Sequence, residues 1–242
     1  MKLIIVRHGD PDYSIDSLTP TGWAEAECLV PRMKKLDVKA FYVSPLGRAR
    51  DTAAATLKAL GREATVKPWL REFACSMPKP WLDHETCIWD WLPADWTAEP
   101  MYYDKDHWFD TPEMRKAGAE AEYRWVCQGL DDLLAEHGYR RKDNYYLAER
   151  PNEDTIVFFC HFGLECVLLS HLLGVSPMVL WHGTAAAPTS VTTVNTEERR
   201  EGIANWRMAA FGDISHLYVA GREPSFSCRF RECYYRDDQR LD

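Results

Sequence analysis

Residues 3–9, Leu-Ile-Ile-Val-Arg-His-Gly, decide the fold of this chain. The unbroken aliphatic run Leu3–Val6 is typical of a strand that is buried on both faces of a parallel sheet. Three residues of different chemistry follow at its carboxyl end, where open parallel sheets bind their ligands. Arg7 offers a planar fork for phosphate or carboxylate, His8 is a candidate nucleophile, and Gly9 allows close backbone approach. These three residues are therefore the first candidates for a functional site.

Strand and helix patterns alternate along much of the chain. Thr19 is a suitable N-cap and Pro20 a suitable first residue for a helix that we expect to run towards Lys35. The other expected elements are a strand at Ala40–Ser44, a helix at Leu46–Leu60, a helix at Glu120–His137, a strand at Thr155–Cys160, a helix at His161–Leu173, and a hairpin of Ser190–Val194 with Trp206–Phe211. This order predicts an α/β fold, a three-layer α/β/α sandwich with a mainly parallel central sheet.

The segment from about residue 74 to residue 113 interrupts this pattern. It is rich in acids and prolines and shows neither a helical nor a strand repeat. Its tryptophans are Trp81, Trp89, Trp91, Trp96 and Trp108. We expect a Trp-rich cap that is inserted into one domain spanning residues 1–242. A packed lid is the main interpretation, and a surface that stacks on sugars or binds a partner is the alternative.

Composition limits the partners of this protein. The chain has 242 residues, of which 46% are hydrophobic, as expected for a globular domain. Its formal net charge of -8 argues against sequence-independent binding to nucleic acid or to an anionic membrane. No apolar run has the length of a signal peptide core or a membrane span. Eight scattered cysteines without a Cys-x-x-Cys pair are typical of free thiols, so we expect a cytoplasmic protein.

A second histidine and a second arginine occupy similar positions. His161 and Gly163 directly follow a predicted strand, so His161 can face His8 at one edge of the sheet. Arg48 falls in the first turn of a predicted helix, where the helix dipole also attracts anions. Arg50 is the rival cation, but two positions along a helix turn a side chain to nearly the opposite face. Only one of the two arginines can therefore enter a phosphate site with the other residues, and the family pattern Arg-Ala-x-x-Thr-Ala in the resemblance given next selects Arg48 and leaves Arg50 at the surface.

Taken together, these segments resemble the histidine phosphatase superfamily, the phosphoglycerate mutase-like proteins. The matching residues are Arg7-His8-Gly9, Leu18-Thr19 with Gly22, Ser44 with Arg48-Ala49 and Thr52-Ala53, Leu70-Arg71-Glu72, and His161 with Gly163. They occur in the order and spacing of the family and cover most of the chain, leaving the cap and the tail after Gly221 unmatched. The resemblance implies a phosphoglycerate mutase-like fold.

The resemblance also implies a mechanism. His8 would attack phosphorus in line and become a phosphohistidine, which water then hydrolyses. The residues that would bind the phosphate are Arg7, Arg48, His161, Gly9 and Thr19. Two guanidinium groups and a cationic imidazole, that of His161, would neutralise the phosphoryl charge without a metal or another cofactor.

Glu72 resembles the general acid of the family. Its context departs from the family pattern, because related phosphatases usually follow this glutamate with a glycine and an aromatic-acid-glycine turn. Here Phe73-Ala-Cys-Ser-Met-Pro78 follows. Asp10, Asp83 and Glu85 therefore compete with Glu72 for the role.

Three further histidines have no metal-ligand spacing, so we expect structural roles for them and predict no metal site. They are His171, His182 and His216. His216 lies near the predicted end of the sheet, from where it can approach the phosphate site.

These residues predict a phosphomonoester hydrolase whose partner is a small-molecule phosphate ester. A phosphoglycerate-type mutase is one alternative, although it must retain its product by cationic groups and the cap is poor in Lys and Arg. A non-catalytic protein that binds phosphorylated ligands is the other alternative. The acidic cap argues against strongly anionic leaving groups. A homodimer is compatible with the sequence.

Overall fold

The structure is a computed structural model that describes residues 1–227, 229–236 and 238. The strands are β1 (Lys2–Arg7), β2 (Pro11–Asp12), β3 (Ser17–Leu18), β4 (Val38–Val43), β5 (Thr65–Val66), β6 (Ser76–Pro78), β7 (Glu85–Cys87), β8 (Tyr139–Lys142), β9 (Tyr145–Ala148), β10 (Thr155–Cys160), β11 (Val191–Arg200) and β12 (Ile203–Asp213). The helices are α1 (Pro20–Met33), α2 (Gly47–Leu60), α3 (Pro93–Trp96), α4 (Pro112–Lys116), α5 (Ala119–Glu136), α6 (Phe162–Leu173), α7 (Pro177–Gly183) and α8 (Ser215–Val219), with 3-10 turns η1 (Pro68–Leu70) and η2 (Pro100–Tyr103).

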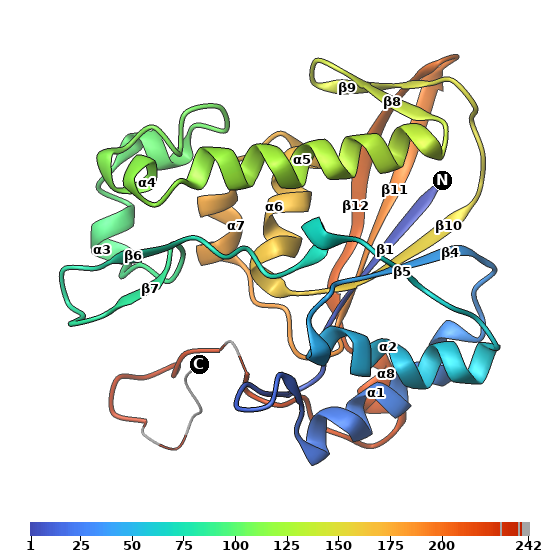
Figure 1. The fold of residues 1–242 in the computed structure, drawn as a ribbon, viewed down its shortest axis with the longest axis horizontal. Coiled ribbons are helices and arrows are strands. Elements are labelled where there is room, and N and C mark those ends of the chain that lie inside the picture. Colours follow the sequence, from blue (N-terminus) through green and yellow to red (C-terminus); the bar gives the residue numbers. More distant parts are fainter. Residues whose placement is uncertain (228, 237, 239–242) are drawn as a thin grey trace.

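The central sheet of the described residues has eight strands in the order β5-β4-β10-β1-β11-β12-β9-β8. Strands β5, β4, β10 and β1 are parallel, and β11, β12, β9 and β8 continue the sheet in antiparallel pairs. Helices α5, α6 and α7 cover one face, and α1, α2 and α8 cover the other (Figure 1). The predicted three-layer α/β fold is therefore confirmed.

The two middle strands separate two hydrophobic cores. Leu3 and Ile5 of β1 point into the core under α5 and α6, whereas Ile4 and Val6 point into the core under α1 and α2. Strand β10 alternates in the same way, and all six of its residues are buried. Successive side chains of a strand alternate between its faces, so only a continuous apolar run can fill both cores.

The predicted helix boundaries hold to within a few residues because local signals set them. The Thr19 hydroxyl oxygen caps α1 by accepting from the N–H of Gly22 at 3.1 Å. Gly61 and Gly174 end α2 and α6 in the left-handed conformation, with φ values of 61° and 71°. Glycine adopts this conformation without steric cost.

The Trp-rich segment from residue 74 to residue 113 contains the β6–β7 hairpin, α3, η2 and the start of α4. Its side chains Met77, Ile88 and Trp108 belong to the same hydrophobic core as Phe158 of β10 and Leu164 of α6. Trp108 is fully buried. The segment lacks periodicity but is well packed, because its apolar side chains share a core with those of α5, α6 and α7.

Two parts of the sheet were not predicted in full. The β8–β9 hairpin was missed, and its turn is formed by Asp143 in a left-handed conformation with φ of 53°. Strands β11 and β12 extend beyond the expected hairpin into polar residues up to Arg200 and from Ile203, where β12 also pairs with β9. Pairing with a neighbouring strand here outweighs the weak apolar pattern.

The cysteines are spread over several elements of the fold. Free thiols in the described residues include Cys28, Cys75, Cys87, Cys127, Cys160 and Cys233. Cys228 lies outside the described residues. Within the described part of the chain, none of the helices is both long and apolar enough to cross a membrane.

Helix α1 contacts the backbone that follows β1 through Gly22. A methyl group on Gly22 would lie 2.2 Å from the carbonyl oxygen of Asp10 and 2.8 Å from its nitrogen. The same contact fills the space at Gly9, where a methyl group would lie 2.8 Å from the carbonyl oxygen of Gly22. Only glycine lets α1 approach the residues after β1 so closely.

We expect the Gly22→Ala substitution to lower the free energy of unfolding by roughly 1–3 kcal/mol, because the added methyl group must displace backbone atoms. Urea denaturation followed by circular dichroism measures the change. Gly183→Ala is the matched control, because a methyl group at Gly183 meets nothing within 4 Å. A Gly22→Ala protein as stable as the control would contradict the close packing of α1.

Candidate active site

His8 lies at the carboxyl end of β1 and is 2% exposed. Its backbone N–H donates to the carbonyl oxygen of Cys160 at 2.9 Å, which ties it to β10. Its Nδ1 lies 2.8 Å from the carbonyl oxygen of Gly9. A carbonyl oxygen can only accept, so Nδ1 carries the ring proton and Nε2 keeps its lone pair. Burial and the charges of Arg7 and Arg48 hold the pKa of His8 well below its usual value.

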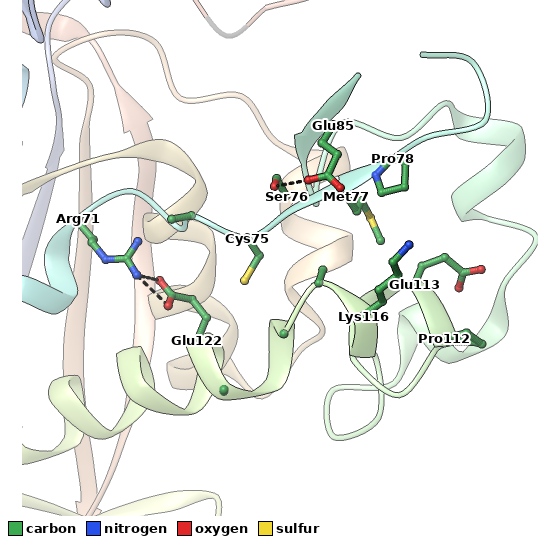
Figure 2. Close-up of a pocket in the computed structure, with 14 residues that line it drawn as sticks. Arg71, Cys75, Ser76, Met77, Pro78, Glu85, Pro112, Glu113, Lys116 and Glu122 are labelled. Carbon is green, nitrogen blue, oxygen red and sulfur yellow. Dashed lines mark hydrogen bonds and ion pairs between the residues drawn. The ribbon is translucent and has the colours of Figure 1, made fainter. Parts of the chain in front are cut away.

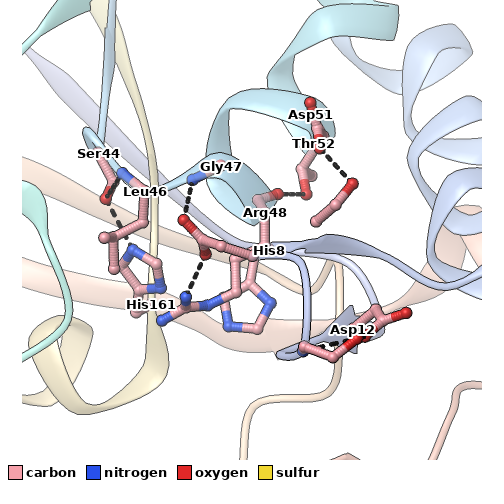
Figure 3. A network of polar contacts seen from close by, with 12 residues as sticks. His8, Asp12, Ser44, Leu46, Gly47, Arg48, Asp51, Thr52 and His161 are labelled. Carbon is pink, nitrogen blue, oxygen red and sulfur yellow. Dashed lines mark hydrogen bonds and ion pairs between the residues drawn. The ribbon is translucent and has the colours of Figure 1, made fainter.

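His161 follows β10 as His8 follows β1, and their ring centroids are 5.1 Å apart (Figure 3). Its Nε2 lies 2.8 Å from the hydroxyl oxygen of Ser44. That oxygen also accepts from the N–H of Leu46 at 3.2 Å, so its own proton can be donated to Nε2. Nδ1 of His161 is buried and has no hydrogen-bond partner among the described residues. This buried nitrogen is therefore available to a hydrogen-bond acceptor.

The expectation that His161 is a cation concerns the site with a phosphate bound. Burial, the neighbouring His8 and the charges of Arg48 and Arg7 hold the pKa of His161 well below its usual value. A bound phosphate dianion would act in the opposite direction, because an adjacent negative charge favours the protonated ring.

Arg48 lies in the first turn of α2, as predicted, and its side chain is 12% exposed. Its Nη1 donates to Asp16 at 2.6 Å, and its guanidinium lies over the ring of Tyr13 at 5.3 Å. Its Nε is buried without a partner among the described residues. The amino terminus of α2 is already occupied, because the second carboxylate oxygen of Asp16 accepts from the N–H of Gly47 at 2.7 Å. Arg48 therefore keeps an unused donor, whereas the terminus of α2 has an internal anion.

Arg7 is fully buried and donates to groups far away in the sequence. Its Nη1 donates to the carbonyl oxygens of Ala186 at 2.6 Å and Ser227 at 3.0 Å, and its Nη2 donates to the Ser227 hydroxyl at 3.2 Å. The C-terminal segment thus reaches a residue of the predicted phosphate site. No sequence signal pointed to Ser227, because the tail lacks periodicity and its contact depends on the path of the whole chain.

Glu25 of α1 links the C-terminal segment to the residues after β1. It is 1% exposed. One carboxylate oxygen accepts from the N–H of Asp10 at 2.9 Å, and the other accepts from the N–H of Ser225 at 3.2 Å. This buried carboxylate was also missed, because a single Glu on an amphipathic helix is normally a surface residue.

Glu72 lies against the amino terminus of α6. Its Oε1 accepts from the N–H groups of Phe73 at 2.9 Å and Leu164 at 2.8 Å, and its Oε2 accepts from the N–H of Gly163 at 3.4 Å. Burial raises the pKa of Glu72, although these donors and Arg48 oppose the rise. The carboxyl therefore lies at the start of the helix that follows His161. It holds its proton to a higher pH than an exposed glutamate does.

The competing carboxylates are placed differently. Asp10 is buried and accepts from the Thr19 hydroxyl at 2.7 Å. Asp83 is exposed beside His84, and Glu85 is exposed and accepts from a serine of the same hairpin. The structure thus gives Glu72, rather than these residues, contacts with the helix that follows His161.

Gly9 and Thr19 were predicted to bind phosphate, and the structure gives both of them internal contacts. The space at Gly9 receives the backbone of Gly22 rather than a ligand. Its N–H donates to the Thr52 hydroxyl at 2.9 Å. The Thr19 hydroxyl is used in the cap of α1 and in its bond to Asp10. Arg50 is exposed, as expected for a surface cation.

The other histidines make structural contacts. His171 lies 2.8 Å from Asp131, and His182 accepts from the N–H of Trp91 at 3.1 Å. His216 lies 3.1 Å from the Thr189 hydroxyl, and the N–H of Thr189 donates to the His8 carbonyl. His216 is therefore one residue removed from His8. In the described part of the chain, no group of three or more His, Cys, Asp or Glu is placed to hold a metal ion.

Glu165 is a second buried carboxyl in the first turn of α6, and sequence reasoning missed it. It is 1% exposed, and neither carboxylate oxygen has a hydrogen-bond partner among the described residues. Burial raises its pKa to about 7, although Thr192 and Arg7 lie near enough to oppose the rise. No periodicity marks it, because every position of α6 around it is buried as well.

A cavity of about 770 Å³ lies between β6 and helices α4 and α5 (Figure 2). Its lining includes Arg71, Cys75, Lys116 and Glu122, and Arg71 pairs with Glu122 at 2.7 Å. None of the residues around His8 lines it. The cavity is therefore separate from the histidine site.

Comparison with known proteins shows a match to one family. The family described as histidine phosphatase superfamily (branch 1) matches residues 3–209. A probable phosphatase of Schizosaccharomyces pombe is 23% identical over 231 residues, which are 90% of this chain and 95% of that protein. The chain belongs to the histidine phosphatase superfamily.

Solved structures show the same fold. A phosphoserine phosphatase of Entamoeba histolytica, in complex with phosphoserine, has a TM-score of 0.56 at 21% identity and covers 89% of this chain and 98% of its own. A mycobacterial glucosyl-3-phosphoglycerate phosphatase has a TM-score of 0.53 at 20% identity, with 87% and 98% covered.

The pKa of Glu165 makes stability depend on pH. Its folded-state pKa of about 7 exceeds its ordinary value of 4.5, so its stabilising contribution is present below pH 4.5 and is lost as the pH rises through 7. We expect Glu165→Gln to be about 3 kcal/mol more stable than the unmodified protein at pH 8, with no gain at pH 4. Urea denaturation at both pH values measures this. The control is Glu27→Gln at an exposed position, and an equal effect of pH on the Glu165 variant and the unmodified protein would contradict the assignment.

The contact of Ser227 with Arg7 predicts a role for the tail. We expect deletion of residues 222–242 to weaken binding of inorganic phosphate about tenfold, because Arg7 loses acceptors that hold its guanidinium in place. Isothermal titration calorimetry measures the affinity. Deletion of residues 230–242 is the control, since it keeps Ser227. Equal or tighter binding after the longer deletion would contradict this role.

Proposed function

We propose that this protein is a metal-independent phosphomonoester hydrolase that acts through a phosphohistidine on His8. The observation that carries the proposal is the arrangement of polar groups around His8. The His8 ring is neutral with an unprotonated Nε2, and buried donors on Arg48 and His161 have no partner among the described residues. A phosphoryl group beside His8 would supply the acceptors and the negative charge that this arrangement requires.

The first step transfers the phosphoryl group to the protein. The lone pair on Nε2 of His8 attacks phosphorus, and the new N–P bond forms as the bond between phosphorus and the ester oxygen breaks. Glu72 gives its proton to the departing oxygen, which leaves as an alcohol. The raised pKa of Glu72 supports this role, because it favours the protonated carboxyl that a general acid requires.

The second step returns the protein to its starting state. The Glu72 carboxylate takes a proton from water, and the water oxygen attacks phosphorus as the N–P bond breaks. Inorganic phosphate leaves, His8 is again neutral, and Glu72 is again protonated. Arg7, Arg48 and His161 hold the equatorial oxygens in both steps.

The class of substrate is a small phosphate monoester. The phosphoserine and glucosyl-3-phosphoglycerate phosphatases with the same fold act on such esters by their names, which supports the class but selects no member of it. We further propose that the segment 74–113 caps the leaving group within one domain of residues 1–242. A cytoplasmic location and a homodimeric state of the protein stay predictions.

A phosphoglycerate-type mutase is less well supported. It must hold a second anionic group while the phosphoryl group returns, and the segment 74–113 has only Lys79 and Lys105 as basic residues apart from histidine. Lys79 is 3% exposed and donates to backbone carbonyls, and Lys105 pairs with Asp106 at 2.7 Å. Neither lysine is placed to retain a product.

We expect the purified protein to hydrolyse p-nitrophenyl phosphate in the presence of EDTA, and His8→Ala to reduce kcat by at least about a thousandfold because the nucleophile is lost. Release of p-nitrophenol measures the rate. Arg50→Ala is the matched control, since Arg50 is exposed on α2.

Three results would contradict the proposal. Activity that EDTA abolishes would require a metal, and an active His8→Ala protein would require another nucleophile. Binding of phosphate esters without hydrolysis of any ester would favour the non-catalytic alternative.

A further inference from the structure

Trp89 brings an aromatic ring from the segment 74–113 to the amino terminus of α6. A methyl group placed on Gly163 would lie 2.6 Å from Trp89 Cη2, 2.7 Å from its Cζ2, and 2.9 Å from Glu72 Oε1. The six-membered ring of Trp89 and the carboxyl of Glu72 therefore both lie against the same glycine. No side chain larger than hydrogen fits between them.

The ring of Trp89 is held from several sides. It packs on Trp181 with centroids 5.6 Å apart and on Phe73 at 6.4 Å. Trp181 is itself fixed, because its Nε1 donates to the carbonyl oxygen of Gly163 at 2.9 Å. These contacts place the indole by packing on α6 and α7, so its position does not depend on the hairpin alone.

The backbone of Trp89 is held by a buried ammonium group. Lys79 donates to the carbonyl oxygen of Trp89 and, at 3.1 Å, to that of Asp90. Asp90 adopts a left-handed conformation with φ of 74°, which turns the chain at this point. The lysine thus anchors the turn that presents the ring to α6.

The side chain of Trp89 is partly exposed. The segment that carries it has two lysines, both engaged, against nine acidic residues. A group beside Glu72 would therefore meet an aromatic ring, and neither lysine of the segment 74–113 is open to pair with it. This environment favours an uncharged apolar or aromatic group over an anionic one.

We propose that Trp89 is a specificity-determining residue that contacts the leaving group of the ester, and that the preferred substrates are phosphate monoesters with an uncharged aromatic leaving group. The inference rests on the proposed function, because it places the leaving group beside Glu72 as the proton donor. Trp89 also helps to bury Glu72, because both side chains lie against Gly163.

Benzyl phosphate and ethyl phosphate test this directly. Benzyl alcohol and ethanol are of similar acidity, so both leaving groups need the proton of Glu72, and the two esters differ mainly in the aromatic ring. We expect the unmodified protein to favour benzyl phosphate by about tenfold in kcat/KM and 3-phosphoglycerate, an anionic ester, to be the poorer substrate. Trp89→Ala should abolish the preference for the benzyl ester, and Trp89→Phe should keep most of it.

The pH profile distinguishes this role from a loss of structure. The general acid must be protonated, so kcat falls as the pH rises through its pKa. In Trp89→Ala, water reaches Glu72, and the alkaline limb of the profile for ethyl phosphate should move to lower pH. The matched control is Trp125→Ala, because Trp125 is 40% exposed and packs on Arg71 rather than on Gly163. It should change neither the preference nor the limb.

The outcomes separate this inference from the proposed function. Equal kcat/KM for the two neutral esters in the unmodified protein, or an equal loss for both in Trp89→Ala, would overturn it. If His8→Ala abolishes hydrolysis of both esters in that case, the proposed function stands and the role of Trp89 alone fails.

Discussion

The structure depends on two guanidinium groups that lie beside two imidazole rings with little exposure to water. Burial and the positive charges of Arg7 and Arg48 hold the pKa values of His8 and His161 well below their usual range. Buried charge is costly unless it is paired. Arg7 meets carbonyl oxygens and a hydroxyl, and Arg48 meets one carboxylate at its Nη1. The site therefore gathers positive charge and hydrogen-bond donors around His8.

Two carboxylates lie at the amino termini of the two helices beside this site. Asp16 occupies the amino terminus of α2 and Glu72 that of α6, so neither terminus is left as an open anion site. Their pKa values move in opposite directions. Hydrogen bonds from Gly47 and Arg48 outweigh burial and lower the pKa of Asp16, whereas burial dominates at Glu72 and raises it. The same local motif thus lowers the pKa of one carboxyl and raises that of the other.

The sequence was sufficient for the parts of the site that follow regular elements. His8 and His161 end aliphatic strands, and Arg48 opens a helix with clear boundaries, so each could be located from its neighbours in the chain. The contacts of Arg7 with Ser227, of Asp16 with Arg48, and of Trp89 with Gly163 could not be predicted, because they join segments whose approach depends on the packing of the whole fold. The same holds for Glu165, which looks like any helical glutamate until α6 is seen to be buried on all sides. The protonation of His161 required the structure as well, since burial decides it.

The most direct measurement is acid-free trapping of the protein during turnover, followed by mass spectrometry and ³¹P NMR. A phosphate monoester is mixed with the protein, and the reaction is stopped at high pH, where phosphohistidine survives. The account predicts one phosphoryl group on Nε2 of His8 and none in the His8→Ala protein. A phosphoryl group on another residue, or turnover with no phosphoprotein in a rapid quench, would contradict it.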